Sequence, residues 1–132
     1  MVQHLDIFES EGVRKFNNHK KKGKWLVLYH AKWCHHCVNF IPTWQKLKTH
    51  LKKRNVNCAS IEYNVMNETK PKVEVIGFPT IHLLKDGKVK KVYNESDREI
   101  KTILKFVGLP KKPTKKKKKA LKKKKSLKKK KL

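Results

Sequence analysis

The sequence predicts an α/β fold in which helices cover both faces of a mixed β-sheet. The residue patterns follow the order strand, helix, strand, helix, hairpin, helix, which is typical of such a layered domain. Residues 24–30 form an apolar run rich in strand formers, as expected for a central, buried strand. Asp86-Gly87, between two strand-like segments, indicates a two-residue hairpin and therefore an antiparallel pair within the sheet.

The first half of the chain is expected to contain two strands and two helices. A short edge strand at 2–5 precedes a loosely helical apolar spacing from Ile7 to Phe16 and a basic loop at 17–23. The strand at 24–30 leads into a long helix, in which Pro42 should introduce a kink because it lacks an N–H group. The apolar face of this helix consists of Phe40, Trp44, Leu47 and Leu51.

The second half is expected to complete the sheet and add two helices. The expected elements are a strand at 56–63, a short helix at 69–75 with Pro71 in its first turn, hairpin strands at 80–85 and 88–93, and a last helix carrying Ile100, Ile103, Leu104 and Val107. Asp97 is expected to serve as the cap or first-turn acid of the last helix, and Gly108 and Pro110 should end it.

Charge divides the chain into a domain and a tail. The chain has 36 lysines and arginines against 10 acids, and every acid lies before residue 100. Residues 111–132 contain 15 lysines and no acid, so the tail carries 15 of the 26 net positive charges. We therefore expect one domain over residues 1–109 and a lysine-rich, low-complexity tail over 110–132 that is disordered or helical.

The tail has several possible uses, and all of them depend on a run of five lysines that follows Pro113-Thr114. This run consists of Lys115, Lys116, Lys117, Lys118 and Lys119. It resembles a nuclear import signal and would also bind nucleic acid or another anionic surface without sequence preference. A tail that only improves solubility is the remaining alternative. No aromatic residue interrupts the lysines, so the tail is not built to stack on bases.

No apolar segment has the length of a membrane span, and the N-terminus does not resemble a secretory signal. We therefore expect a cytoplasmic or nuclear protein that is a monomer. Three cysteines in such a chain indicate a redox or metal role rather than a disulfide framework. A metal site is disfavoured because four contiguous residues do not surround a tetrahedral ion easily, so no metal is expected.

The cysteines of Trp33-Cys34-His35-His36-Cys37 lie where the central strand gives way to the long helix. Free N–H groups and the helix dipole at such a position favour a thiolate on the first cysteine. A thiolate attacks disulfides, and a second cysteine three residues later can resolve the mixed disulfide that results.

These residues resemble the thioredoxin superfamily, and most closely the catalytic domain of protein disulfide isomerases. The similarity spans roughly residues 5–107. It rests on the Cys-x-x-Cys run, the following Pro42-Thr43-Trp44, the loop Gly77-Phe78-Pro79-Thr80 and the Asp86-Gly87 turn. The resemblance implies a thioredoxin-like fold and a thiol–disulfide oxidoreductase that needs no cofactor and exchanges disulfides with protein cysteines. The alternative is a non-catalytic scaffold of this fold that binds nucleic acid or other polyanions through its tail.

The resemblance also implies roles for individual residues. Cys34 would be the exposed attacking thiolate and Cys37 the more buried resolving thiol. His36 stands where oxidising family members carry a histidine, and it would stabilise the thiolate and make the disulfide more oxidising. His35 replaces the glycine usual in the family and would either add to this effect or face solvent. Three further residues would bind the substrate. Pro79 would be a cis residue, the backbone of Phe78 would pair with the substrate, and Trp33 would shape the surface.

The chain departs from the family at one buried position. Family members usually place a carboxylate six residues before the first cysteine, where it moves protons to and from the resolving thiol. Leu28 occupies that position here, and Ser60 stands where disulfide isomerases place a partner lysine. Deprotonation of Cys37 would then depend on water or on the histidine pair.

Overall fold

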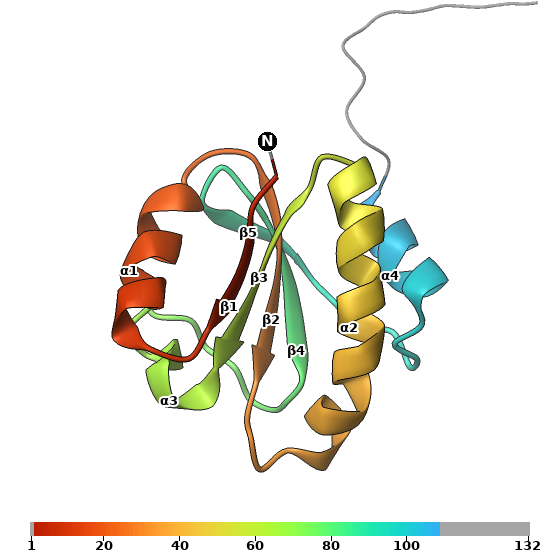
Figure 1. Cartoon of the computed structure of the whole chain (residues 1–132), viewed down its shortest axis with the longest axis horizontal. Helices are drawn as coiled ribbons and strands as arrows, with labels where there is room; N and C mark the ends of the chain where they lie inside the picture. Colours follow the sequence, from red (N-terminus) through yellow and green to blue (C-terminus); the bar gives the residue numbers. More distant parts are fainter. Residues whose placement is uncertain (1, 109–132) are drawn as a thin grey trace, which may run out of the picture.

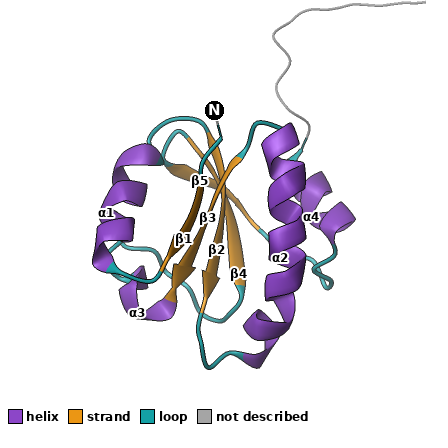
Figure 2. Ribbon diagram, in the orientation of Figure 1, coloured by secondary structure: helices purple, strands orange, loops and turns teal. Residues whose placement is uncertain are grey.

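The computed structural model describes residues 2–108, which form a five-stranded sheet with helices on both faces (Figures 1 and 2). The strands are β1 (His4–Ile7), β2 (Lys24–His30), β3 (Asn57–Glu62), β4 (Thr80–Lys85) and β5 (Lys88–Val92), and the helices are α1 (Ser10–His19), α2 (His35–Lys53), α3 (Tyr63–Met66) and α4 (Ile100–Val107). The strand order is β1-β3-β2-β4-β5. The predicted mixed sheet is confirmed, because β1, β3 and β2 run parallel while β4 and β5 pair in antiparallel fashion.

Strand β2 is the centre of the sheet, with β3 on one side and β4 on the other. Six of its seven residues are buried, which confirms the prediction from its apolar composition. Successive side chains of a strand point to opposite faces. Leu26 and Leu28 therefore join the core under α2 and α4, whereas Trp25 and Val27 join the core under α1 and α3.

Helix α2 covers one face of the sheet with the predicted apolar stripe, since Phe40, Trp44, Leu47 and Leu51 are all buried. Pro42 lies inside the helix, near its start. In Figure 1 the first turns of α2 lie at an angle to the rest of the helix, as the missing N–H group of a proline would cause.

The prediction of a helix at 69–75 is wrong. The short helix α3 occurs earlier, at Tyr63–Met66, and residues 69–75 have no regular secondary structure. The reason is a tertiary contact: the Asn17 side chain of α1 accepts a hydrogen bond from Lys70 N and donates one to Glu68 O. The bond to Glu68 O engages the carbonyl that would accept the first hydrogen bond of a helix starting at residue 69, and the bond from Lys70 N holds the segment against α1.

Several boundaries also differ from the sequence prediction. The first strand is His4–Ile7 rather than 2–5, because it pairs in register with β3 and buries Ile7. Helix α1 continues to His19, into the predicted loop. Asp97 is not the cap of α4, which is Glu99; the Asp97 carboxylate instead accepts a hydrogen bond from Glu99 N.

Leu47 allows a direct test of the core between α2 and the sheet, since its side chain is completely buried. Leu47→Ala should lower the free energy of unfolding by about 3 kcal/mol, because it removes apolar contacts and leaves a cavity. Lys46→Ala, at an exposed position of the same helix, should change it by less than about 0.5 kcal/mol. Urea unfolding of the two variants measures both values, and equal small effects would contradict this packing.

Candidate active site at the start of helix α2

The two cysteines lie at the junction of β2 and α2, as the sequence predicts. Cys34 is the N-cap residue of α2, and its Sγ accepts a hydrogen bond from the backbone N–H of Cys37 at 3.1 Å. Residues at this position normally cap the helix with an oxygen, so a sulfur here satisfies a free N–H group of the first turn. The hydrogen bond and the helix dipole both stabilise negative charge on Cys34 Sγ.

Both cysteines are buried, which corrects the expectation that Cys34 is exposed. Cys34 is 6% exposed and Cys37 is 2% exposed, and both are free thiols. They form a small apolar cluster with Ala31, against which the partly buried Phe78 packs. The order of accessibility is the expected one, but Cys34 is far less exposed than the sequence suggests.

The buried position has a clear electrostatic consequence for Cys37. Burial raises the pKa of the Cys37 thiol, and the adjacent Cys34 side chain raises this pKa further, while the positive charge of Arg98 opposes the shift. Cys37 is therefore a neutral thiol at physiological pH, and it must lose a proton before it can act as a nucleophile.

The loop between α3 and β4 brings aromatic side chains to the cysteine pair. The Phe78–Pro79 peptide bond is cis, as expected. The ring of Phe78 lies 5.7 Å from that of Trp33 and 5.7 Å from that of Tyr63, each in an edge-to-face arrangement. Trp33 and Tyr63 also contact each other edge to face, so the three rings form one cluster, here called the aromatic cluster.

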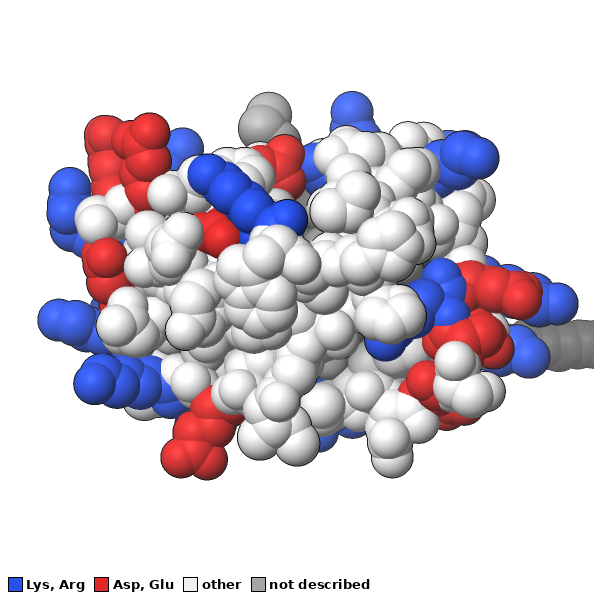
Figure 3. Space-filling model, turned by 90° about the horizontal axis from the view of Figure 1, so that it is seen from below, with Lys and Arg blue, Asp and Glu red and all other residues white. Residues whose placement is uncertain are grey.

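The aromatic cluster is open to solvent although its members are large. Trp33 is 68% exposed and Tyr63 is 46% exposed. Figure 3 shows the end of the molecule at which β2 meets α2: its centre is free of Lys, Arg, Asp and Glu, and charged side chains lie around it. Exposed aromatic groups favour contact with another polypeptide. Tyr63 was not identified from sequence, because its placement depends on where α3 begins.

The two histidines between the cysteines lie on the outer side of the first turn of α2. His35 and His36 are both exposed, and their ring centroids are 6.3 Å apart. They flank the N-terminus of the helix, whereas the cysteines at either side of them point inward. Their imidazoles are therefore accessible to solvent and to any substrate that reaches Cys34.

A cavity of about 360 Å³ lies behind Cys37, between α2 and the sheet. Leu28, at the position of the family carboxylate, is buried in the apolar core and does not line this cavity. Three strands each contribute a polar residue to its lining: Asp6 of β1, His30 of β2 and Ser60 of β3. The sequence reasoning missed Asp6 and assigned no role to His30, because their proximity depends on the order of the strands.

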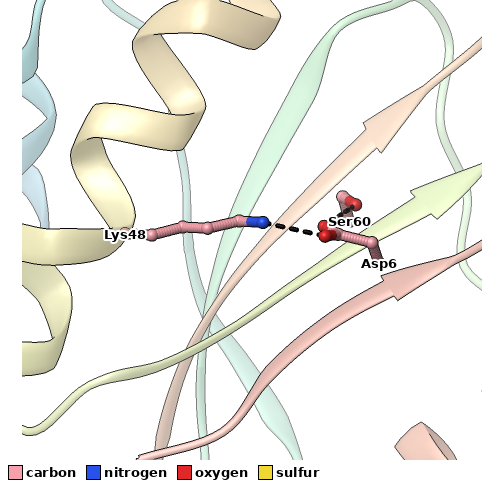
Figure 4. Close-up of polar contacts among 3 residues, drawn as sticks. All are labelled: Asp6, Lys48 and Ser60. Carbon is pink, nitrogen blue, oxygen red and sulfur yellow. Dashed lines mark hydrogen bonds and ion pairs between the residues drawn. The ribbon is translucent and has the colours of Figure 1, made fainter.

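Asp6 is held by two side chains (Figure 4). Its Oδ1 accepts a hydrogen bond from Ser60 Oγ and its Oδ2 one from Lys48 Nζ, both at 2.8 Å. Burial alone would raise the pKa of the Asp6 carboxyl, but the hydrogen bonds from Lys48 and Ser60 outweigh it and lower this pKa. Lys48 is only 13% exposed, so the ion pair is partly shielded from water.

The third cysteine does not join this site. Cys58 is buried in β3, and burial raises the pKa of its thiol to about 12, so it is unreactive. Within residues 2–108, no three His, Cys, Asp or Glu side chains are placed to hold a metal ion, and no helix is both long and apolar enough for a membrane span.

The lysines predicted to bind nucleic acid or another polyanion are not part of the site described above. Lys115, Lys116, Lys117, Lys118 and Lys119 all lie outside the described residues, which end at 108. Their role therefore stays a prediction from sequence, and the site rests on residues of the domain alone.

Comparison with known proteins agrees with this geometry. The thioredoxin family model matches residues 9–108. The chain is 32% identical over 104 residues to the thioredoxin domain-containing protein 5 homolog of Drosophila melanogaster, covering 75% of this chain and 25% of that protein. It is 31% identical over 91 residues to protein disulfide-isomerase A4 of Rattus norvegicus, covering 63% of this chain and 14% of that protein.

The fold comparison gives the same result. The structure superposes on thioredoxin of Fasciola hepatica with a TM-score of 0.60 at 21% identity, covering 80% of this chain and 96% of that one. The predicted thioredoxin-like fold is therefore confirmed. The chain spans only a quarter or less of the two curated relatives named above, which are longer proteins.

The Asp6 ion pair should contribute to stability in a pH-dependent manner. A carboxyl group whose pKa is lowered by folding stabilises the folded state above its ordinary value of 3.8, and this contribution is lost as the pH falls through the folded pKa. Asp6→Asn should therefore lower the free energy of unfolding at neutral pH by about 1 kcal/mol, a small value because Asp6 is partly exposed.

The difference in the free energy of unfolding between wild type and Asp6→Asn should narrow as the pH is lowered from about 7 to about 3. Urea unfolding over this range measures it. Glu74→Gln, at an exposed acid of the segment before β4, is the matched control and should show no such gap. A gap that is constant with pH would contradict the ion pair.

Proposed function

We propose that this chain, which belongs to the thioredoxin family, is a thiol–disulfide oxidoreductase that acts on cysteines of other proteins. The observation that carries the proposal is the geometry of Cys34 and Cys37, with the first sulfur at the helix N-terminus and the second buried beside it. This pair has the arrangement that disulfide exchange requires: a sulfur at the N-terminus of a helix, where the attacking group is placed, and a nearby resolving thiol.

The proposed reaction has two exchange steps. In the first, the Cys34 thiolate attacks a substrate disulfide, forms a mixed disulfide and releases one substrate cysteine as a thiolate. In the second, Cys37 loses its proton and attacks Cys34 Sγ, which breaks the mixed disulfide and releases the other substrate cysteine. The Cys34–Cys37 pair is oxidised by two electrons, and the substrate disulfide is reduced to two thiols. The same steps in reverse oxidise a substrate.

The aromatic cluster and the Phe78 backbone are the proposed substrate site. Within the described residues the peptide group of Phe78 takes part in no hydrogen bond, although its ring packs against the cysteine pair. An extended segment could pair with this group by strand addition, with its side chains on the exposed rings of Trp33 and Tyr63. The uncharged surface shown in Figure 3 would accept substrates of varied charge.

His35 and His36 are proposed to set the redox potential. Their exposed imidazoles lie at the same helix end as Cys34, where a donated proton or positive charge stabilises the thiolate. A more stable thiolate stabilises the reduced pair, and the disulfide becomes a stronger oxidant.

Replacing both histidines with alanine should therefore make the Cys34–Cys37 couple less oxidising, by about 30 mV for each tenfold loss in the equilibrium constant for reduction. Equilibration with glutathione buffers, followed by thiol alkylation, measures the potential. His50→Ala, at an exposed histidine far along the same helix, is the control. An unchanged or more oxidising potential in the double variant would contradict the assignment.

Reduction of insulin with a dithiol as electron donor tests the catalytic function itself. Cys34→Ser should abolish activity, a loss of at least about 100-fold, because no attacking thiolate remains. Cys58→Ala removes the buried third cysteine and should retain most of the activity. If Cys34→Ser reduced insulin as fast as wild type, or if the wild type were inactive, the proposal would be wrong.

A further inference from the structure

The cavity behind Cys37 contains a second titratable group that the exchange chemistry described so far does not use. His30, the last residue of β2, lines this cavity together with Cys37. It is 6% exposed, and its Nε2 has no hydrogen-bond partner within residues 2–108. A buried imidazole with an unpaired nitrogen is uncommon and needs a physical explanation.

Trp44 strengthens this observation. Its Nε1 is also buried without a partner among the described residues, and the residue lines the same cavity. Both residues therefore border a space large enough for several water molecules. The exposed side chains of Lys32 and Val38 line it as well, so water can enter from solvent. Such a space can carry a proton between groups that do not touch.

Cys37 is the group in this cavity that must release a proton. The second exchange step needs its thiolate, and burial opposes ionisation by raising the pKa of the thiol. Efficient release requires an acceptor within reach of the sulfur, directly or through one water molecule.

The carboxylates near the cavity are poor acceptors. Both oxygens of Asp6 already accept hydrogen bonds, and its pKa is lowered. Glu62, which pairs with His30 across β2 and β3, accepts hydrogen bonds from Asn64 N and Lys32 N through its two oxygens. To accept the proton of Cys37, which is a weak acid, either carboxylate would have to give up a hydrogen bond that it already accepts.

His30 is better suited than either carboxylate to accept the proton of Cys37. Burial lowers the pKa of its imidazole, while the charges of Glu62 and Asp6 oppose that shift, so the ring is neutral at physiological pH and can accept a proton. The same two carboxylates would stabilise the imidazolium once it forms. The ring is held in place by an edge-to-face contact with Phe8, at 5.6 Å between centroids.

We propose that His30 is the proton acceptor for Cys37, and that it acts across the cavity through water. The inference rests on the proposed function, since it concerns the second exchange step. As Cys37 Sγ attacks Cys34 Sγ, its proton passes to the neutral imidazole, the bond between Cys34 and the substrate breaks, and the substrate sulfur leaves as a thiolate. His30 then returns the proton to solvent, and no net charge remains in the cavity.

The charged and titratable groups around His30 come from four parts of the fold. Asp6 on β1 and Glu62 on β3 favour the imidazolium, and the lysines of this region are Lys32, which lines the cavity, and Lys48 of α2. Lys48 is neutralised by Asp6, and Lys32 lies over the Phe8 ring at 5.7 Å. Cys37 is the remaining group. The two carboxylates are the charges that act on the pKa of His30, and they support proton uptake.

The aromatic disulfide 5,5′-dithiobis(2-nitrobenzoate) separates the two exchange steps. Reaction with the reduced full chain releases one coloured thiolate when Cys34 attacks and a second when Cys37 resolves the mixed disulfide. His30→Gln should leave the first phase unchanged and slow the second by on the order of 100-fold at neutral pH, since general base catalysis typically contributes this much.

His82→Gln is the matched control. His82 is 5% exposed and has an unpaired Nδ1 within residues 2–108, like His30, but it packs on Tyr29 and does not line this cavity. Both phases should keep wild-type rates in this variant. Equal slowing of the second phase in the two variants would show a general effect of lost stability and would overturn the proposal.

The pH dependence gives a readout in the wild type that needs no variant. If His30 accepts the proton, the second phase should be level between about pH 7 and pH 8, because the imidazole is already neutral there. Without such an acceptor the rate should rise about tenfold per pH unit over this range, because the thiol itself must ionise. A steady rise in the wild type would overturn the proposal.

These results are distinguishable from failure of the proposed function. A wild-type chain that releases no second thiolate and does not reduce insulin would refute the oxidoreductase assignment. A wild-type chain that shows both phases, and whose second phase is unaffected by His30→Gln, would leave that assignment intact and refute only the role of His30.

Discussion

The active-site geometry depends on how helix α2 begins. The hydrogen bond from Cys37 N–H to Cys34 Sγ places a sulfur where an oxygen cap would normally lie, and it fixes both cysteines relative to the end of β2. That junction is rigid because β2 is the buried central strand and because α2 is anchored by Trp44 and Leu47. The packing of the whole domain thus positions two sulfur atoms.

The distribution of charge separates the site from the rest of the molecule. The chain has a net charge of +26, yet the end of the domain at which β2 meets α2 is free of charged side chains at its centre (Figure 3). In the proposed function a substrate segment would meet Trp33 and Tyr63, whose rings are exposed.

The cavity behind Cys37 is lined by residues of different strands. With Leu28 in the apolar core, three adjacent strands contribute Asp6, His30 and Ser60 to this region. Asp6 is stabilised as a carboxylate by Ser60 and Lys48, which leaves the neutral imidazole as the free acceptor. Burying an unpaired polar group costs free energy, so the unpaired imidazole of His30 does not serve the stability of the fold and fits the proposed role as a proton acceptor.

Local residue patterns were sufficient for much of this protein. Composition and periodicity predict the strand at 24–30, the hairpin at Asp86-Gly87 and the long helix with its apolar stripe. The order of these elements predicts that the cysteine pair lies between the central strand and the long helix. Only the tertiary structure decided the features that depend on distant residues. Asn17 holds residues 68–70 against α1, Phe78 packs against the cysteine pair, and the strand order β1-β3-β2 brings Asp6 to the cavity that His30 and Cys37 share. The physical reason is that periodicity reports which side of an element is buried, whereas the neighbours across that buried face are set by packing between elements far apart in sequence.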